Sequence, residues 1–395
     1  MPAVDLFAVR SAATERLDAY LDDLRWMVDL DCGTYTPSGV NRIADRCSER
    51  FSAMGFEVER RAYDGEPELG DCLVGRRDGP GPRVLLIGHM DTVFDEGTAA
   101  RRPYRVEDER AFGPGVSDMK GGLLAGFLAL EALGAAGVEV AATFVCNPDE
   151  EIGSVFSKEI IREVASESDV CFVLECARAN GNLVSARKGI TELRVDIDGR
   201  AAHAGVEPEK GSNAILEASH KVLALQALNG QWDGVTVNVG VIAGGTRPNV
   251  VPDRCTLQVD MRSPREHLFA GAEAEARRIA ETNTVPGVTS TAHLLAEHRP
   301  MERTPASERL VTLARSVAGD LGFDVADQAT GGASDANTTS AIGVPTLDGL
   351  GPIGGDAHGE AEWLDLSSVI PRTTLLAGLI ARAGEALGDG ARAGD

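Results

Sequence analysis

The chain has 395 residues, which is more than one hydrophobic core usually serves, so two domains are expected. Hydrophobic residues make up 43% of the sequence, a share that supplies a sizeable core and argues against global disorder. The formal net charge of −23 argues against nucleic acid and anionic membrane surfaces as partners. It says little about the substrate, because a local basic pocket can lie within an acidic protein.

Neither a membrane span nor a secretion signal is expected. No stretch approaches the roughly 20 apolar residues of a transmembrane helix, and residues 1–10 lack the apolar segment of a signal peptide. The seven cysteines are scattered without CxxC pairs, which is typical of small buried residues with reduced thiols. These features predict a cytoplasmic protein.

The first part of the chain predicts two helices followed by a pair of strands. Apolar residues recur with helical spacing over 12–30, and a second helix is expected over 41–54. Strands are expected over 57–62 and 72–76. The polar stretch 94–110 has no periodicity and is expected to form a loop that leads to a short strand.

One segment between these elements organises the predicted site. Val84 to Ile87 is an apolar run that predicts a buried parallel strand, and His89 and Asp91 follow it. Because side chains alternate along a strand, the two would point the same way if the extended path continues. The pair suits a metal-bound imidazole with a carboxylate near its other ring nitrogen. A loop with two solvated polar side chains is the alternative.

A second segment places an acidic residue just before a helix. Glycines and a proline over 113–122 indicate a sharply turning backbone, and an apolar helix is expected over 119–133. Asp118 therefore lies at the start of this helix. Either Asp118 or Ser117 could be an ordinary N-cap, which is the alternative to a ligand role.

Two further predicted strands end in acidic residues. The strand over 138–146 leads into Asp149, Glu150 and Glu151, and the strand over 170–174 leads into Glu175. A solvated turn would tolerate three adjacent carboxylates, whereas a divalent cation would make use of them. In an open α/β sheet the carboxyl ends of the strands form the edge where ligands bind.

The pattern changes at about Gly189, where alternating apolar and polar residues indicate antiparallel strands. The order β-α-β-β-α-β predicts a ferredoxin-like domain. Its strands are expected over 191–198, 235–242, 255–261 and 288–296, with helices over 213–228 and 264–283.

Helix–strand alternation returns after this domain, with a helix over 305–321, a strand over 344–349 and a last helix over 366–387. The sequence therefore predicts an α/β catalytic domain, 1–188 and 302–395, with an inserted α+β domain, 189–301.

This ordered set of motifs resembles the M20 metallopeptidases, within them the glutamate carboxypeptidase (carboxypeptidase G2-like) group. The resemblance runs from about Leu85 to Arg372 and implies a mixed-sheet, zinc-peptidase-like domain with helices on both faces and an inserted lid and dimerisation domain. The motifs that carry it are Gly88-His-Met-Asp-Thr-Val93, Gly113-Pro-Gly-Val-Ser-Asp-Met-Lys-Gly121, Asp149-Glu-Glu-Ile-Gly-Ser154, Leu174-Glu175, Arg200-Ala-Ala-His-Ala-Gly205, Arg247-Pro-Asn-Val-Val-Pro252, Gly331-Gly-Ala-Ser-Asp335 and Ala357-His-Gly359.

The resemblance implies a centre of two metal ions. His89 would bind one ion and His358 the other, Asp118 would bridge them, and Glu175 would lie on the same ion as His89. Glu151 would complete the second coordination sphere. Imidazole and carboxylate ligands suit two Zn²⁺ ions, with Mn²⁺ or Co²⁺ as alternatives.

The resemblance also assigns the remaining acidic residues. Asp91 would orient His89, and Glu150 would be the general base that takes a proton from the attacking water. Two adjacent glutamates at a strand end cannot readily bind one ion equivalently, so one ligand and one base is the natural division.

The inserted domain would carry the substrate contacts. His203 matches a residue that stabilises the oxyanion in the active site of the partner subunit, which implies a homodimer. Asn249 and Arg262 match residues that hold the substrate's free carboxylate, a role that suits the guanidinium fork. Arg299 matches a basic residue of the side-chain pocket, with a surface ion pair as the alternative.

The sequence thus predicts an amidohydrolase that releases a C-terminal amino acid with a free carboxylate, with glutamate as the first candidate. Glutamate-releasing members have a lysine soon after the position of Glu175, where this chain has Asn180-Gly-Asn182. An N-acyl-amino-acid deacylase or dipeptidase with the same site is therefore the alternative. A catalytically inactive binding module is a further alternative, but no ligand and no base is missing from the motifs.

Overall fold

Buried hydrophobic side chains form two separate clusters in the computed structural model, which describes residues 4–387. The chain divides into a main unit, Met1–Ser185, Arg303–Ala329 and Ser334–Asp395, and an inserted unit, Ala186–Glu302 with Thr330–Ala333. The predicted inserted domain, 189–301, does not include that last segment. Residues 1–3 and 388–395, which the sequence assigns to the catalytic domain, lie outside the described residues.

The main unit is built on a six-stranded mixed sheet with the order β1-β2-β6-β3-β7-β14. Strands β6, β3, β7 and β14 run parallel, whereas β1 and β2 pair antiparallel. The central strands are almost completely buried, which explains their apolar sequences. The strands are β1 (Glu57–Arg61), β2 (Cys72–Arg77), β3 (Val84–His89), β6 (Ala142–Asn147), β7 (Val170–Val173) and β14 (Thr346–Leu347).

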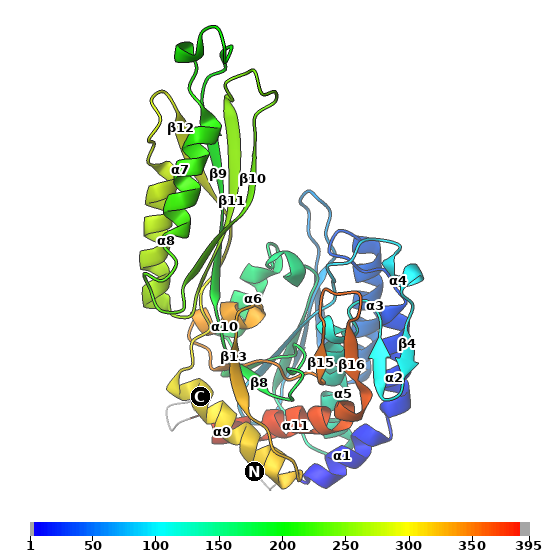
Figure 1. Cartoon of the computed structure of the whole chain (residues 1–395). Helices are drawn as coiled ribbons and strands as arrows, with labels where there is room; N and C mark the ends of the chain where they lie inside the picture. Colours follow the sequence, from blue (N-terminus) through cyan, green and yellow to red (C-terminus); the bar gives the residue numbers. More distant parts are fainter. Residues whose placement is uncertain (1–3, 388–395) are drawn as a thin grey trace. The chain divides into compact units, whose positions relative to one another are not determined.

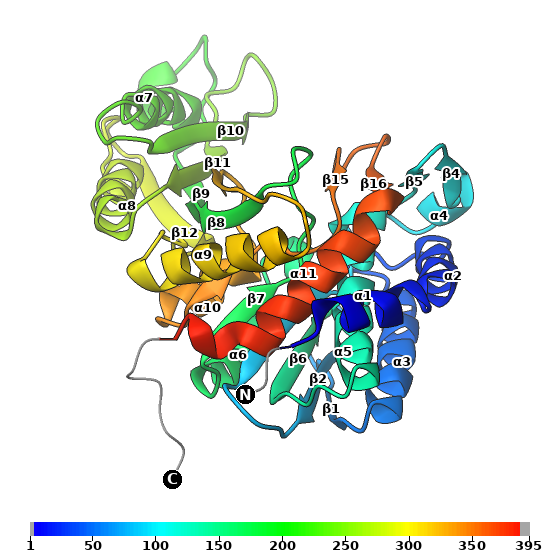
Figure 2. The ribbon, with the colours of Figure 1, turned by 90° about the horizontal axis from the view of Figure 1, so that it is seen from below.

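Helices cover both faces of this sheet (Figure 1). On one side α6 and α10 pack together beside β6 and β7, and on the other side α5 packs on β3, with α1 and α11 against it. Figure 2 shows α1, α5 and α11 side by side. The helices of this unit are α1 (Leu6–Thr14), α2 (Leu17–Val28), α3 (Pro37–Ala53), α5 (Gly121–Ala135), α6 (Ser157–Ser166), α9 (Pro305–Asp320), α10 (Asp335–Ala341) and α11 (Val369–Arg382).

The single helix predicted over 12–30 is wrong. The chain forms α1 and α2 instead, and the break lies at Arg16, whose backbone leaves the helical region with φ −107° and ψ 5°. Asp5 caps α1 by accepting hydrogen bonds from the backbone N–H groups of Phe7 and Ala8. Buried apolar residues continue with helical spacing on both sides of Arg16, so the periodicity does not reveal the break.

A small four-stranded sheet with the order β15-β16-β5-β4 lies beside the main sheet of this unit. The loop predicted over 94–110 is wrong in part, because it contains the short helix α4 (Thr98–Arg101) and strand β4 (Arg105–Glu107). The other strands of this small sheet are β5 (Arg110–Phe112), β15 (Gly354–Gly355) and β16 (Trp363–Asp365). Strands β8 (Leu183–Arg187) and β13 (Asp327–Thr330) form a separate pair.

The inserted unit contains a four-stranded antiparallel sheet with the order β10-β11-β9-β12 and two helices on one face (Figure 1). Inward-facing residues of the strands and both helices form its own core. Its elements are β9 (Gly189–Asp198), α7 (Ala214–Gln226), β10 (Thr236–Gly244), β11 (Arg254–Ser263), α8 (Glu266–Glu281) and β12 (Thr289–His298). This is the predicted β-α-β-β-α-β order.

Two expectations from composition can be compared with the structure. All seven cysteines lie in the described part of the chain, and each is buried with a free thiol. Within residues 4–387, no helix combines the length and the apolar character that crossing a membrane requires.

Helix α5 lies unusually close to the end of β7, and a glycine makes this approach feasible. A Cβ atom at Gly122 would lie 1.8 Å from the carbonyl oxygen of Leu174, the residue before Glu175. Gly134 lies on the same helix, but a Cβ atom there would meet nothing within 4 Å.

We therefore expect Gly122→Ala to destabilise the protein by about 1–3 kcal/mol, because the backbone must shift to accommodate the methyl group. Gly134→Ala is the matched control and should be neutral or slightly stabilising, because alanine favours a helix by about 1 kcal/mol over glycine. Thermal or urea unfolding measures both. Equal stability of the two variants would contradict the close approach.

Candidate metal centre

Three neighbouring parallel strands deliver acidic and imidazole side chains to one edge of the main sheet. His89 is the last residue of β3, and Glu175 lies two residues beyond the end of β7. Glu150 and Glu151 lie in η2 (Glu150–Ile152), a short 3-10 helix that follows β6. Because β6, β3 and β7 are adjacent and parallel, their carboxyl ends meet at one edge.

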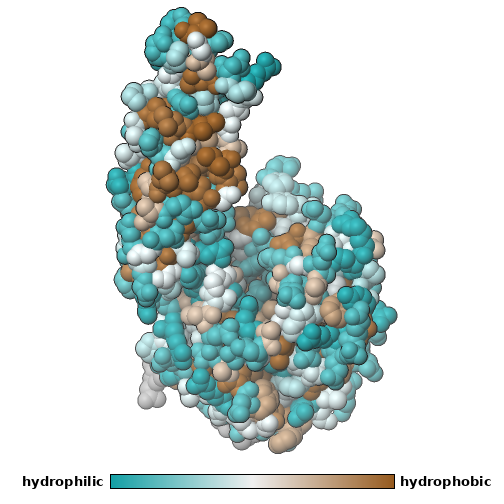
Figure 3. All heavy atoms as spheres, viewed as in Figure 1, coloured by the Kyte–Doolittle hydropathy of each residue, from teal (hydrophilic) through white to brown (hydrophobic). Residues whose placement is uncertain are grey.

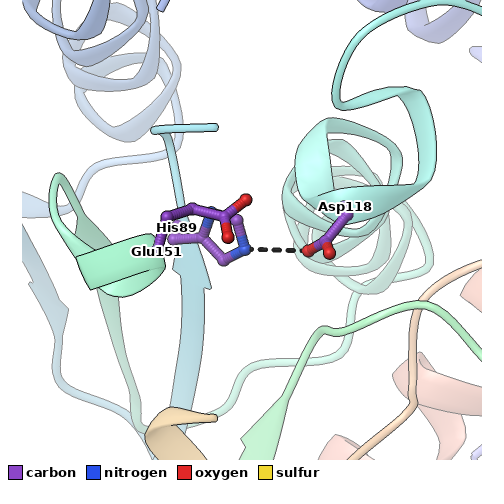
Figure 4. Close-up of side chains that lie close together, drawn as sticks. All are labelled: His89, Asp118 and Glu151. Carbon is purple, nitrogen blue, oxygen red and sulfur yellow. Dashed lines mark hydrogen bonds and ion pairs between the residues drawn. The ribbon is translucent and has the colours of Figure 1, made fainter. Parts of the chain in front are cut away.

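Asp118 lies between two imidazoles and faces each with a different carboxylate oxygen. Its Oδ1 atom is 3.1 Å from Nε2 of His89, and its Oδ2 atom is 3.2 Å from Nε2 of His358. Figure 4 shows His89, Asp118 and Glu151 converging. The N-cap alternative is not what the structure contains, because α5 has no side-chain cap. Asp118 belongs to the irregular turn η1 (Val116–Lys120) that precedes this helix, and its peptide bond to Met119 is cis.

His358 reaches this cluster from the loop between β15 and β16. Its Nε2 atom is 3.0 Å from Oε2 of Glu151 as well as near Asp118. Its backbone is left-handed, with a φ of +64°, which is uncommon for a residue other than glycine. Such strain is typical of functional sites, where the surrounding structure maintains it.

The second ring nitrogen of His89 is held by Asp91. The Nδ1 atom is 3.0 Å from the backbone carbonyl oxygen of Asp91 and 3.4 Å from its carboxylate. That carboxylate also accepts hydrogen bonds from the backbone N–H groups of Glu150 and Glu151, both at 3.2 Å, and from the hydroxyl of Thr34 at 2.6 Å. Asp91 therefore joins the imidazole to both glutamates.

The two imidazoles have a strongly shifted proton affinity. Burial lowers the pKa of His89, but hydrogen bonds to the neighbouring carboxylates outweigh burial and raise the pKa well above its usual value. Hydrogen bonds to Asp118 and Glu151 raise the pKa of His358 to about 11. Burial alone would raise the pKa of Asp118, yet the imidazoles hold it below its usual range.

The two adjacent glutamates also have raised pKa values, in contrast to Asp118. Burial raises the pKa of Glu150 well above its usual value, and the charges of Glu175 and Glu151 add to this effect. Burial also raises the pKa of Glu151, against the hydrogen bond from His358. The cluster thus gathers more negative charge than burial tolerates, a condition that a cation relieves.

The residues present fit a divalent cation. Ligand atoms of His89, Asp118 and Glu151 lie within 4.8 Å of one another, and so do those of His89, Glu150 and Glu175. The Oε1 atom of Glu151 is buried and has no hydrogen-bond partner among the described residues. Buried carboxylate oxygens normally have a partner, so this atom is a candidate ligand. Nitrogen and oxygen donors of this kind suit zinc and related ions.

The other predicted site residues belong to the inserted unit, so the geometry above comes from the main unit alone. His203 is exposed, and its Nδ1 atom accepts a hydrogen bond from the backbone N–H of Gly205. Asn249 is exposed as well. Arg262 pairs with Asp260 at 3.1 Å and donates to the carbonyl of Gly331 at 2.8 Å.

Arg299 has carboxylate partners within its own unit. It lies 2.6 Å from Glu297 and 3.3 Å from Glu266, and its guanidinium stacks over the ring of Phe269. A surface ion pair is the alternative to a substrate contact, and these ion pairs by themselves do not test the substrate role.

Sequence reasoning did not single out two polar residues that contact this centre. Thr34 bonds to Asp91, and Glu362 bonds to the turn that carries Asp118. Neither has a signal in the sequence, because their partners are distant in the chain.

The fold and the cluster define a metal-dependent hydrolase. The model of the peptidase family M20/M25/M40 matches residues 85–382, and the chain therefore belongs to this family. The predicted resemblance, the predicted enzyme class and the predicted α/β fold with an inserted domain are confirmed.

Three similar proteins illustrate the range of the family. The chain is 31% identical to carboxypeptidase G2 from Pseudomonas sp. (strain RS-16), over 93% of this chain and 90% of that protein. It is 26% identical to succinyl-diaminopimelate desuccinylase from Dechloromonas aromatica (strain RCB), over 83% of this chain and 89% of that protein. The crystal structure of aminopeptidase PepT from Bacillus cereus ATCC 10987 has the same fold, with a TM-score of 0.77, 22% identity and coverage of 92% of this chain and 98% of that chain.

Proposed function

We propose that this hydrolase uses two divalent ions, with zinc as the first candidate, to release a C-terminal amino acid that carries a free carboxylate. The observation that carries the proposal is the position of Asp118, whose two oxygens face His89 and His358 separately. A carboxylate in this position can serve two ions at once and offset their repulsion.

The same distances suggest how the ligands divide. Glu175 lies 3.7 Å from Nε2 of His89, and Glu151 lies 3.0 Å from Nε2 of His358, so each imidazole has a glutamate of its own. Divalent ions held there would polarise the amide carbonyl and make water more acidic.

Glu150 is proposed as the general base. Its carboxylate would accept a proton from the attacking water and then give that proton to the nitrogen of the leaving amine. The raised pKa that burial causes suits a group that must both take and release a proton. The hydrogen bond from its backbone N–H to Asp91 fixes its position beside the ligands.

Glu150→Gln should lower kcat by about 10²–10⁴-fold, because the amide side chain cannot carry the proton. The variant should keep the wild-type metal content, measured by plasma mass spectrometry, since Glu150 is not among the proposed ligands. A variant that hydrolyses as fast as wild type would show that another group carries the proton.

Two readings of the substrate remain, and different observations favour them. The likeness to carboxypeptidase G2 favours release of glutamate, with Asn249 and Arg262 proposed to hold its α-carboxylate and Arg299 its side chain. The loop after Glu175 favours a different amino acid or acyl donor. There Asn180 and Asn182 both donate hydrogen bonds to Gln328, so these positions are neutral amides rather than a cation.

A substrate panel separates the two readings. It would compare N-acyl-glutamate, N-acyl-alanine and N-acyl-glutamate with an amidated α-carboxylate, all with the same acyl group. We expect the amidated substrate to be hydrolysed slowest. Arg299→Ala should reduce the glutamate-over-alanine ratio of kcat/KM by about 10–100-fold, the usual range for one charged hydrogen-bond partner. If the wild-type enzyme shows no preference for glutamate, Arg299 does not have the proposed role and a deacylase or dipeptidase is favoured. If the amidated substrate is hydrolysed as fast as the free acid, the protein is not a carboxypeptidase.

We further propose that the inserted unit forms a homodimer and that His203 acts in the site of the partner subunit. Exposed apolar side chains support this assembly, since they lie along α7 and the edge strand β10 (Figure 3). They include Leu216 and Leu223 on the helix and Val241 and Ile242 on the strand. An edge strand flanked by apolar side chains is a surface on which a second copy can pair.

The double variant Leu223→Glu with Ile242→Glu should sediment as a monomer and lose most of its activity, because His203 would no longer reach a partner's site. Leu295→Glu, on the opposite edge strand β12, is the matched control, since Leu295 is also exposed. Sedimentation velocity and kcat/KM measure the outcome. A double variant with wild-type mass and wild-type activity would contradict the proposed dimer.

A further inference from the structure

Glu362 is a buried carboxylate that the proposed mechanism does not use. Its exposed fraction is 1%, and it lies one residue before β16 and four residues after His358. A buried glutamate is rare unless its oxygens have partners, so its surroundings are informative.

The carboxylate of Glu362 accepts four hydrogen bonds from one short turn. Its Oε2 atom accepts from the backbone N–H of Gly115 at 2.8 Å. Its Oε1 atom accepts from the backbone N–H of Ser117 at 2.9 Å, the hydroxyl of Ser117 at 3.1 Å and the backbone N–H of Asp118 at 3.0 Å. All the donors are neutral and belong to the turn that presents Asp118 to the imidazoles.

The segment that carries Glu362 is the one that carries His358. Strand β16 pairs with β5, with Leu364 opposite Ala111, and the carbonyl of Gly359 accepts a hydrogen bond from Arg102 at 2.8 Å. The segment that follows His358 is thus attached at Gly359 and at Leu364, and Glu362, which lies between them, joins this segment to the Asp118 turn.

We propose that Glu362 is a positioning residue that fixes the Asp118 turn relative to the His358 loop and thereby sets the affinity of the second metal ion. This inference rests on the ligand assignment under the proposed function. The physical reason is that the Oδ2 atom of Asp118 and the Nε2 atom of His358 come from segments far apart in the chain. A rigid link between these segments keeps the two ligand atoms at a fixed separation before the ion arrives, so less ordering is needed on binding.

A purely structural role would have a different signature. It would lower the stability of the metal-free protein and leave the metal affinity of the folded protein unchanged. Measuring the affinity for Zn²⁺ alone, by competition with a chromophoric chelator, separates the two roles without any activity assay.

Glu362→Gln is the principal variant, because it keeps the size of the side chain. One of its two terminal atoms becomes an NH₂ group, which must face either the N–H of Gly115 or the donors of Ser117 and Asp118, so donor meets donor. We expect the affinity for the more weakly bound Zn²⁺ ion to fall by about 10–100-fold, the usual cost of losing a residue that orients metal ligands. At limiting Zn²⁺ this variant should therefore have a lower kcat than wild type, and kcat should return when Zn²⁺ is saturating.

Glu360→Gln is the matched control. Glu360 is an exposed glutamate on the same loop, two residues away, and the same chemical change there should leave Zn²⁺ affinity at the wild-type value.

Ser117→Ala keeps the test decisive if Glu362→Gln does not fold. It removes only the hydroxyl donor to Glu362, and it should lower the affinity for the second Zn²⁺ ion by a smaller factor than Glu362→Gln does. The inference would be overturned if the folded Glu362→Gln variant bound Zn²⁺ with wild-type affinity. If only Ser117→Ala folds, wild-type Zn²⁺ affinity in that variant would overturn it. His89→Ala distinguishes this failure from a failure of the proposed metal site. If His89→Ala loses Zn²⁺ while Glu362→Gln keeps wild-type affinity, the ligand assignment stands and only the role of Glu362 is wrong.

Discussion

The arrangement depends on one shared carboxylate. Asp118 faces two imidazoles with its two oxygens, at 3.1 and 3.2 Å, and every other residue of the centre is placed around that contact. Burial raises the pKa of Glu150 and Glu151, and the charges of neighbouring carboxylates add to this effect. Such a cluster is stable only with positive charge among its members, whether from protonated imidazoles or from bound cations.

The fold brings this charge together by simple means. Three adjacent parallel strands end at the same edge, so residues distant in sequence converge there without a long loop. Two contributions need longer connections: the turn before α5 that brings Asp118, and the β15–β16 loop that brings His358. Those two segments are also the ones that Glu362 joins, so hydrogen bonds to a buried carboxylate connect them where the strands cannot position the ligands.

Patterns within the chain predicted much of the fold and part of the centre. The buried strands, the ferredoxin-like order and the acidic strand ends are local signals, and they placed His89, Glu150, Glu151 and Glu175 at one edge. Contacts between distant segments were not predictable. The hydrogen bonds of Glu362 and the break at Arg16 within a continuous apolar stripe depend on partners or backbone angles that no local spacing encodes.

The central claim is that Asp118 serves two ions at once, and counting bound metal tests it most directly. Protein equilibrated with Zn²⁺, dialysed and analysed by plasma mass spectrometry should contain two zinc ions per chain. Asp118→Ala should lose at least one of them, because a shared ligand cannot be removed from one ion alone. A wild-type chain that binds a single ion, or an Asp118→Ala variant that keeps both, would contradict the account.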